Sequence, residues 1–223
     1  MKTIRPLSIL EARVLGVLIE KAHTVPDSYP LSLNTLTLGC NQKTARDPVL
    51  SADEGSVQMA VDALKALSLV FESSGSRVSR YEHNLGRVMA LPSQSVALLA
   101  VLMLRGPQTT SELRANAERL HRFADLSSVE GFLEELAQRP PEQGGALVVL
   151  LPRAPGAREP RWTHLLSGPV DLASLPVTTE TAEFVAVSEL ASLRTQQSAL
   201  QAEVAALRTL VERLYGELGI ARQ

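Results

Sequence analysis

The residues with the clearest chemical potential in this sequence are cations gathered in a few segments predicted to be loops. Lysine and arginine donate hydrogen bonds to phosphate oxygens, and arginine can do so with two parallel N–H groups. On loops, such groups suit contacts with a nucleic-acid backbone, which position a protein without reading base sequence. The candidate binding residues for nucleic acid or another partner are Lys43, Arg46, Arg77, Arg114, Arg119, Arg122, Arg153 and Arg158.

A second interpretation applies to Arg46, because Asp47 follows it directly. Ionic groups in a long loop can pair with their surroundings and hold the loop in place instead of binding a ligand. The segment from Cys40 to Val49 is therefore open to both a functional and a structural interpretation. The sequence alone does not decide between them.

Enzymatic chemistry finds no support in the pattern of nucleophiles and metal ligands. The chain has one cysteine, Cys40, and four histidines, and their spacing does not match a zinc site. Phosphate-binding loops, dinucleotide glycine motifs and nucleophile elbows are also absent from the sequence. We therefore expect a protein that is not an enzyme, with no catalytic residues, metal, cofactor or small-molecule substrate.

The elements that must position the cations come in two copies. The segment Arg80-Tyr81-Glu82-His83-Asn84-Leu85 recurs as Arg161-Trp162-Thr163-His164-Leu165-Leu166. An apolar pattern with helical period precedes each copy, first at Ile9–Lys21 and again at Ser93–Leu104. Strand alternation places His83 and His164 on a buried face, so we expect hydrogen-bonded core histidines and not ligands.

Between the first helix and the repeated ending, each copy contains two further predicted helices and a hairpin. We expect the second helix to begin near Ser32 in one copy and near Thr110 or Ser111 in the other, and the third helix to open at Ser56 or Ser128. The hairpin strands are predicted at Leu69–Glu72 and Val78–His83, then at Ala146–Leu151 and Arg161–Leu165.

Three helices followed by a hairpin is the order of a winged helix-turn-helix domain. The predicted fold is therefore mostly α, of the α+β kind. It has two tandem winged helix-turn-helix domains followed by a C-terminal coiled-coil helix. We place the first domain at residues 1–88, the second at 89–168, a linker at 169–182 and the coiled coil at 183–223.

Several uncommon runs make the chain resemble the bacterial YceH family. In the first half these are Tyr29-Pro30-Leu31-Ser32-Leu33-Asn34, Cys40-Asn41-Gln42-Lys43 and Arg46-Asp47-Pro48-Val49; in the second they are Leu104-Arg105-Gly106-Pro107-Gln108-Thr109, Glu112-Leu113-Arg114, Arg119-Leu120-His121-Arg122-Phe123 and Leu151-Pro152-Arg153. The resemblance implies a tandem winged-helix fold in a family of uncharacterised function. It supplies no catalytic residues.

The C-terminal stretch carries a heptad repeat, which predicts a parallel two-stranded coiled coil and hence a homodimer. Leucine fills the d positions, and β-branched valine fills two a positions. Pairs of glutamate and arginine five places apart would attract across a parallel interface. A single amphipathic helix docked on its own domain is the alternative. The predicted dimerisation residues are Leu190, Leu193, Gln197, Leu200, Val204, Leu207, Val211, Leu214 and Leu218.

The charge of the chain limits how it could contact DNA. The net charge is −2 and the pI is about 6.1, without the basic excess of a dedicated nucleic-acid binder. The predicted outward positions of the third helices are Gln58, Asp62 and Lys65 in the first copy and Glu130, Glu134, Glu135 and Gln138 in the second. Reading of the major groove by the second copy is therefore disfavoured.

Two functions remain open from the sequence. The first is a DNA-associated or regulatory protein that contacts duplex backbone through its hairpin loops and joining loops. The second is a module that docks other proteins through its third helices and coiled coil, without direct DNA binding. The lack of a membrane-spanning run or an export signal and the single cysteine predict a cytoplasmic protein.

The predicted coiled coil can be tested by replacing Leu200 and Leu207 with alanine. Each change removes a buried leucine from every helix of the dimer, at a cost of about 2–5 kcal/mol apiece. We expect the wild-type chain to sediment as a dimer and the double variant as a monomer. A wild-type monomer at a concentration of tens of micromolar would refute the dimer.

Overall fold

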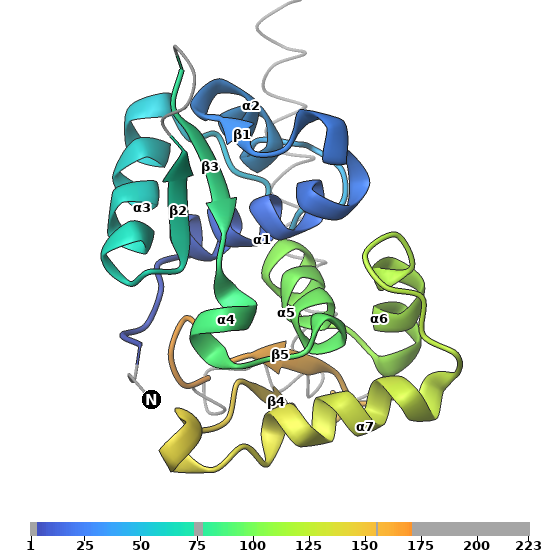
Figure 1. The fold of residues 1–223 in the computed structure, drawn as a ribbon. Helices are drawn as coiled ribbons and strands as arrows, with labels where there is room; N and C mark the ends of the chain where they lie inside the picture. Colours follow the sequence, from blue (N-terminus) through green and yellow to red (C-terminus); the bar gives the residue numbers. More distant parts are fainter. Residues whose placement is uncertain (1–3, 74–77, 155, 171–223) are drawn as a thin grey trace, which may run out of the picture. The chain divides into compact units, whose positions relative to one another are not determined.

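The computed structural model describes residues 4–73, 78–154 and 156–170 (Figure 1). These residues belong to one compact unit, Met1–Leu175. Arg77 and all the predicted dimerisation residues, from Leu190 to Leu218, lie outside the described residues. The coiled coil therefore stays a prediction.

Within the described ranges the fold is mostly helical, with two small sheets, and belongs to the α+β class. The same order of elements occurs twice, with the short helix α4 (Leu85–Met89) between the copies. The first copy comprises α1 (Ile9–Thr24), α2 (Leu33–Cys40), α3 (Glu54–Ala66), β2 (Val70–Ser73) and β3 (Arg80–His83), and the second comprises α5 (Ser93–Arg105), α6 (Thr110–Ala117), α7 (Leu126–Ala137), β4 (Val148–Leu150) and β5 (Trp162–His164).

Each hairpin receives an additional segment from just before the second helix. In the first copy the two-residue strand β1 (Leu31–Ser32) pairs antiparallel with β3, placing Leu31 opposite Tyr81 and giving the sheet order β1-β3-β2. In the second copy Gln108 forms an isolated bridge with Trp162, the residue that matches Tyr81 in the repeat. The repeat is thus present in the backbone pairing as well as in the sequence.

Side-chain caps fix where the helices begin. The hydroxyl of Ser8 and the carboxylate of Glu11 form a capping box at α1, and Thr109 and Glu112 form the same arrangement at α6. A capping box satisfies two backbone N–H groups that a helix start would otherwise leave without partners. The α6 cap is therefore Thr109, one residue before the first of the two predicted positions.

The third helices begin earlier than predicted. Asp53 caps α3 and Asp125 caps α7, each accepting a hydrogen bond from the backbone N–H of a serine three residues later. Those serines, Ser56 and Ser128, are the residues predicted to open the helices. Aspartate is favoured over serine as the cap at these two helices because its carboxylate also interacts favourably with the helix dipole.

Strands β3, β4 and β5 are shorter than predicted, β2 has the predicted length but begins one residue later, and two elements were not anticipated. The outer residues of the predicted strands lie beyond the last paired positions, as at Leu69 and Ala146. Both β1 and α4 went unpredicted, because two residues of strand and five of helix are too short to show a period.

The two copies share one hydrophobic core, with α1 packed against α5 (Figure 1). A continuous run of α1, from Glu11 to Ile19, is buried, as is Ser95 to Leu104 of α5. Gly16 permits close approach, since a Cβ added there would lie 3.0 Å from Cγ of Leu104. The interface between the copies is therefore part of the core.

Replacing Gly39 with alanine should destabilise the fold. A Cβ at Gly39 in α2 would lie 2.6 Å from Cγ1 of Val17, and overpacking of this kind costs about 1–3 kcal/mol. The matched control is Gly131→Ala in α7, where nothing lies within 4 Å of the new atom. That control should gain up to about 1 kcal/mol from helix propensity. Urea unfolding compares the two, and equal effects would contradict the packing.

Candidate functional site

The predicted cations divide into exposed and buried groups. Arg46 alone among those described is buried, and its side chain has no exposed area. The position of Arg77 is not described. The exposed candidates are Lys43, Arg114, Arg119, Arg122, Arg153 and Arg158.

Arg46 forms a closed hydrogen-bond network inside the first copy. Its Nη2 lies 2.6 Å from Oε2 of Glu20 and also donates to Gln42, while its Nε donates to the carbonyl oxygen of Gly39. A second contact, from Nη1 to Oε1 of Glu20 at 3.2 Å, makes the ion pair bidentate. These contacts match the structural interpretation of Arg46, and they leave its guanidinium no exposed surface for a phosphate.

Arg13 in α1 supports the same loop from the other side. It is 1% exposed, and it donates to the carbonyl oxygens of Cys40 at 3.1 Å and Pro48 at 2.6 Å. Burial lowers the pKa of Arg13, and the positive charge of Arg46 adds to this effect. The loop also reaches the second copy, because the backbone N–H of Asp47 donates to the carbonyl oxygen of Leu104 at 2.8 Å.

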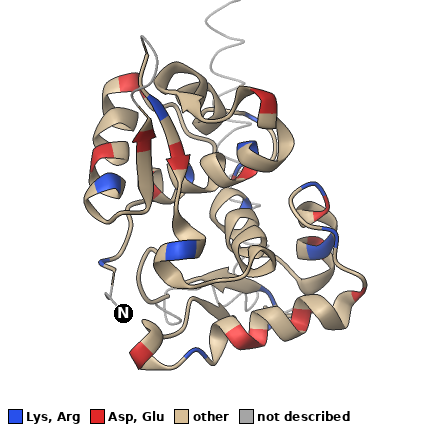
Figure 2. Cartoon of the chain, in the orientation of Figure 1, with Lys and Arg blue, Asp and Glu red and all other residues tan. Residues whose placement is uncertain are grey.

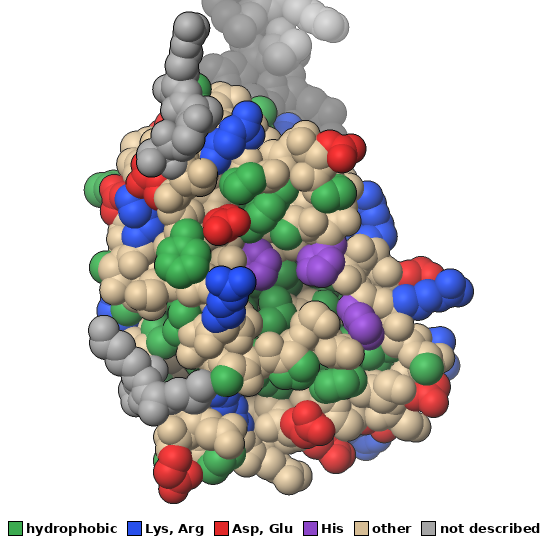
Figure 3. Space-filling view, in the orientation of Figure 1, with side chains coloured by type: hydrophobic (Ala, Val, Ile, Leu, Met, Phe, Trp, Pro, Cys, Tyr) green, Lys and Arg blue, Asp and Glu red, His purple; other side chains and the backbone are tan. Residues whose placement is uncertain are grey.

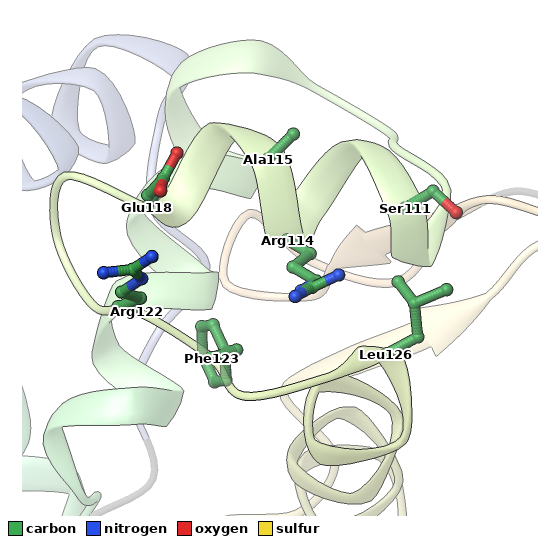
Figure 4. Close-up of a pocket in the computed structure, with 7 residues that line it drawn as sticks. All are labelled: Ser111, Arg114, Ala115, Glu118, Arg122, Phe123 and Leu126. Carbon is green, nitrogen blue, oxygen red and sulfur yellow. The ribbon is translucent and has the colours of Figure 1, made fainter.

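A pocket of about 370 Å³ lies between α6 and the start of α7 (Figure 4). Arg114 extends from α6 toward α7, and its Nη2 donates to the carbonyl oxygen of Ala124 at 3.0 Å. Arg122 comes from the turn between the helices and makes no hydrogen bond or ion pair within the described ranges. The pocket is lined by Ser111, Arg114, Ala115, Glu118, Arg122, Phe123 and Leu126.

The pocket combines cationic and apolar groups. Phe123 is 5% exposed, and its ring makes edge contacts with His121 and Phe132, with centroids 4.7 and 6.0 Å away. Leu126, in contrast, is 41% exposed. Two guanidinium groups and one carboxylate, from Glu118, leave the lining with a net charge of +1. The arrangement can attract an anion and also offer it an apolar contact.

In the first copy a hydrogen bond crosses the corresponding gap between α2 and α3. Asn34 occupies the same position after its helix cap as Ser111, and Glu54 the same position as Leu126. Asn34 Nδ2 donates to Oε1 of Glu54 at 2.9 Å and bridges the two helices. Ser111 and Leu126 cannot form this bridge, so the second copy has a pocket where the first has a contact.

The hairpin loop of the second copy carries two further exposed arginines, Arg153 and Arg158. Neither arginine makes a hydrogen bond or ion pair among the residues that the structure describes. At the base of the hairpin, Arg161 donates to Oε1 of Glu112 at 2.9 Å and to the carbonyl oxygen of Pro107 at 2.7 Å. The hairpin is thus anchored to the start of α6, the helix that forms one wall of the pocket.

Acidic residues recur along α7 (Figure 2), while polar side chains of α3 are engaged within the first copy. In α3, Gln58 accepts from the hydroxyl of Tyr81 and donates to Asp62, while Lys65 pairs with Glu72. In α7 the exposed polar residues are Glu130, Glu134, Glu135 and Gln138. These carboxylates would repel phosphates approaching along α7.

His83 and His164 occupy equivalent positions, opposite Val70 and Val148. Burial lowers the pKa of each to about 4, so both are neutral at physiological pH. The Nδ1 atom of each is buried and has no hydrogen-bond partner among the described residues, contrary to the expected hydrogen-bonded core histidines. Histidine side chains also gather on one face in Figure 3. The described residues contain no group of three or more metal-ligating side chains.

Cys40 is buried, as a small hydrophobic residue would be. Burial raises the pKa of its thiol to about 12. The thiolate is the reactive form of cysteine, so Cys40 offers no nucleophile near neutral pH. Together, the fold and these surfaces define a mostly helical α+β protein with repeated helix-hairpin units and exposed cations on the second unit.

The chain belongs to the family described as "Protein of unknown function, DUF480", and the model of that family matches residues 7–157. It is 60% identical over 219 residues to a UPF0502 protein of Leptothrix cholodnii, covering 97% of each chain. A UPF0502 protein of Methylibium petroleiphilum is 61% identical over 218 residues, covering 97% of this chain and 92% of that protein. Among the helices that the structure describes, none has the length and apolar character needed to span a membrane.

Arg46→Ala should be strongly destabilising, whereas Lys43→Ala should not. Removing Arg46 leaves the partly buried carboxylate of Glu20 without its bidentate partner, and breaking a buried pair costs about 3–5 kcal/mol. Lys43 is exposed in the same loop, so its removal should change the free energy of unfolding by less than about 0.5 kcal/mol. Denaturant unfolding measures both. A near-neutral Arg46→Ala variant would contradict the structural role.

Proposed function

We propose that this protein is a non-enzymatic, dimeric, tandem winged-helix protein that associates with the phosphate backbone of duplex DNA. The observation that carries the proposal is the exposure of Arg153 and Arg158 on the hairpin loop of the second copy. Neither pairs with a carboxylate in the described ranges. Free arginines on a projecting loop suit contacts with phosphate oxygens.

The repeated architecture supports the winged-helix part of the proposal. Each copy has three helices and a hairpin, with an extra segment before the second helix paired to the inner hairpin strand. In this interpretation the hairpins are the wings, and the third helices occupy the position from which helix-turn-helix proteins read the major groove. The proposed dimer rests on the heptad pattern, and a cytoplasmic location, which we also propose, rests on the single cysteine.

The charges favour contact with DNA backbone over reading of bases. The exposed face of α7 carries Glu130, Glu134 and Glu135, which would meet phosphates on both sides of a major groove. Arg119 lies exposed beyond the end of α6 and adds a third cation to the two on the hairpin. Backbone contacts of this kind give binding that depends weakly on base sequence and strongly on salt.

A module that docks other proteins is the second candidate, favoured by apolar exposure on the first copy. Met59 in α3 is 68% exposed and Leu38 in α2 is 65% exposed. Large apolar side chains in contact with water are a common feature of protein-binding surfaces when they form a patch. In this alternative the acidic face of α7 would contact a basic partner, without direct DNA binding.

A salt titration with random-sequence duplex DNA tests the proposal. The slope of log affinity against log salt should become shallower by about 0.9 for each phosphate contact removed. We therefore expect a change of about 0.9 for Arg153→Gln or Arg158→Gln, and about 1.8 for the double variant. The control is Arg87→Gln, which removes the same charge from the exposed surface of α4 and should leave the slope unchanged.

The outcomes separate the two candidates. Absence of binding at about 50 mM salt, where phosphate contacts are strong, would support the protein-docking module. Binding that survives the Arg153 and Arg158 changes with an unaltered slope would show that another surface contacts the DNA. If the slope of log affinity against log salt became equally shallower in these variants and in Arg87→Gln, only the overall charge of the protein would determine DNA binding.

A further inference from the structure

We propose that the pocket between α6 and α7 binds a small organic anion, specifically a phosphate monoester attached to an aromatic ring. The proposal concerns Arg114 and Arg122, which line the pocket, and not the hairpin arginines assigned to DNA. A test of ligand binding in the pocket is therefore independent of a test of DNA binding.

The comparison between the two copies shows what is special about this pocket. The first copy uses the Asn34–Glu54 hydrogen bond across the same gap. It also uses the side chain of Asn41, which accepts from and donates to the backbone of Ala52, to hold the chain before α3. In the second copy Arg114 holds the corresponding chain before α7, through a hydrogen bond to the carbonyl oxygen of Ala124. The space between α6 and α7 is therefore a pocket, and the guanidinium group of Arg114 lines it.

Two guanidinium groups reach this space from separate segments (Figure 4). Arg114 uses one Nη2 hydrogen bond to hold Ala124, and an arginine has five N–H donors, so most of its donors remain for a ligand. Arg122 approaches from the turn and makes no hydrogen bond or ion pair within the described part of the chain. A phosphate monoester is close to doubly negative above its second pKa of about 6, and its three oxygens can accept from both groups.

The remaining lining selects for an apolar body on the anion. Phe123 closes the pocket below Arg114 and Arg122, while Leu126 and Ala115 form walls (Figure 4). The volume of about 370 Å³ falls within the range of small-molecule sites, about 300–1,000 Å³. A flat ring can contact Phe123 and Leu126 while its phosphate meets the arginines. Inorganic phosphate would gain only the second of these contacts.

Glu118 also lines the pocket, and its carboxylate opposes a bound anion. This gives the proposal a directional test, because removal of that charge should strengthen the binding of an anion. A zwitterionic ligand such as an amino acid would use Glu118 to hold its ammonium group, so the same change would weaken its binding. The response to Glu118→Gln therefore distinguishes the two ligand classes.

The experiment titrates the full chain with phenyl phosphate at a pH of about 8, where the phosphate is a dianion, and follows binding by isothermal titration calorimetry and NMR shift changes. Arg122→Gln should weaken binding about tenfold, and Glu118→Gln should strengthen it severalfold. Ser111→Asn combined with Leu126→Glu installs the bridge of the first copy and should abolish binding. Circular dichroism and thermal unfolding check that each variant folds.

Arg119→Gln is the matched control, since it removes an exposed cation of the same turn that does not line the pocket. It should leave phenyl phosphate binding unchanged while reducing DNA binding, if the proposed function holds. Failure of phenyl phosphate to bind at millimolar concentration would overturn the pocket assignment, whatever the DNA result. Equal losses in Arg119→Gln and Arg122→Gln would also overturn it, because they would indicate nonspecific attraction to positive charge.

Discussion

The burial of two guanidinium groups beside the loop between α2 and α3 is the constraint on which the first copy depends. Arg13 and Arg46 carry charge into a region where Arg13 finds only backbone carbonyl oxygens and Arg46 finds the carboxylate of Glu20. A buried charge is costly unless its donors find acceptors, and Arg13 satisfies both Nη groups while its buried Nε has no partner among the described residues. The end of α2 and the loop must therefore keep the carbonyl groups of Gly39, Cys40 and Pro48 in place, since these groups accept hydrogen bonds from the two cations.

The same loop also connects the two copies, because Asp47 is held in place by contacts with the end of α5. Its backbone N–H bonds to Leu104, and its carboxylate lies 3.2 Å from where a Cβ on Gly106 would stand. Gly106 has a φ of +71°, a conformation that glycine adopts at little cost. Together with the contact between α1 and α5, this makes the spacing of the copies a property of the core and not of a linker.

The sequence predicted the repeated frame well because that frame rests on local signals. Helical periodicity located α1 and α5, and the matching endings at Tyr81 and Trp162 located the hairpins. Burial of Arg46 could not be predicted, since its partner Glu20 lies 26 positions away and only the folded chain brings them together. Arg13 was the one sequence clue to buried cations in this region, because it is the lone cation in the apolar run from Ala12 to Ile19. The pocket left no sequence signal, because it arises from the absence of a bridge that Asn34 and Glu54 make in the other copy.

The two copies share a common frame but differ in where they place their cations. Arg80 donates to Pro30 and Arg161 to Pro107, so the hairpin of each copy is tied to the start of its second helix by an equivalent contact. Beyond that frame, the first copy places its central cations in the interior, where they hold a loop. The second copy leaves Arg114, Arg122, Arg153 and Arg158 at the surface, where a charge is available to a ligand. The exposed carboxylates of Glu130, Glu134 and Glu135 on α7 disfavour an approaching anion, so within the second copy the charge favours an anion at the pocket and at the hairpin loop and not along α7.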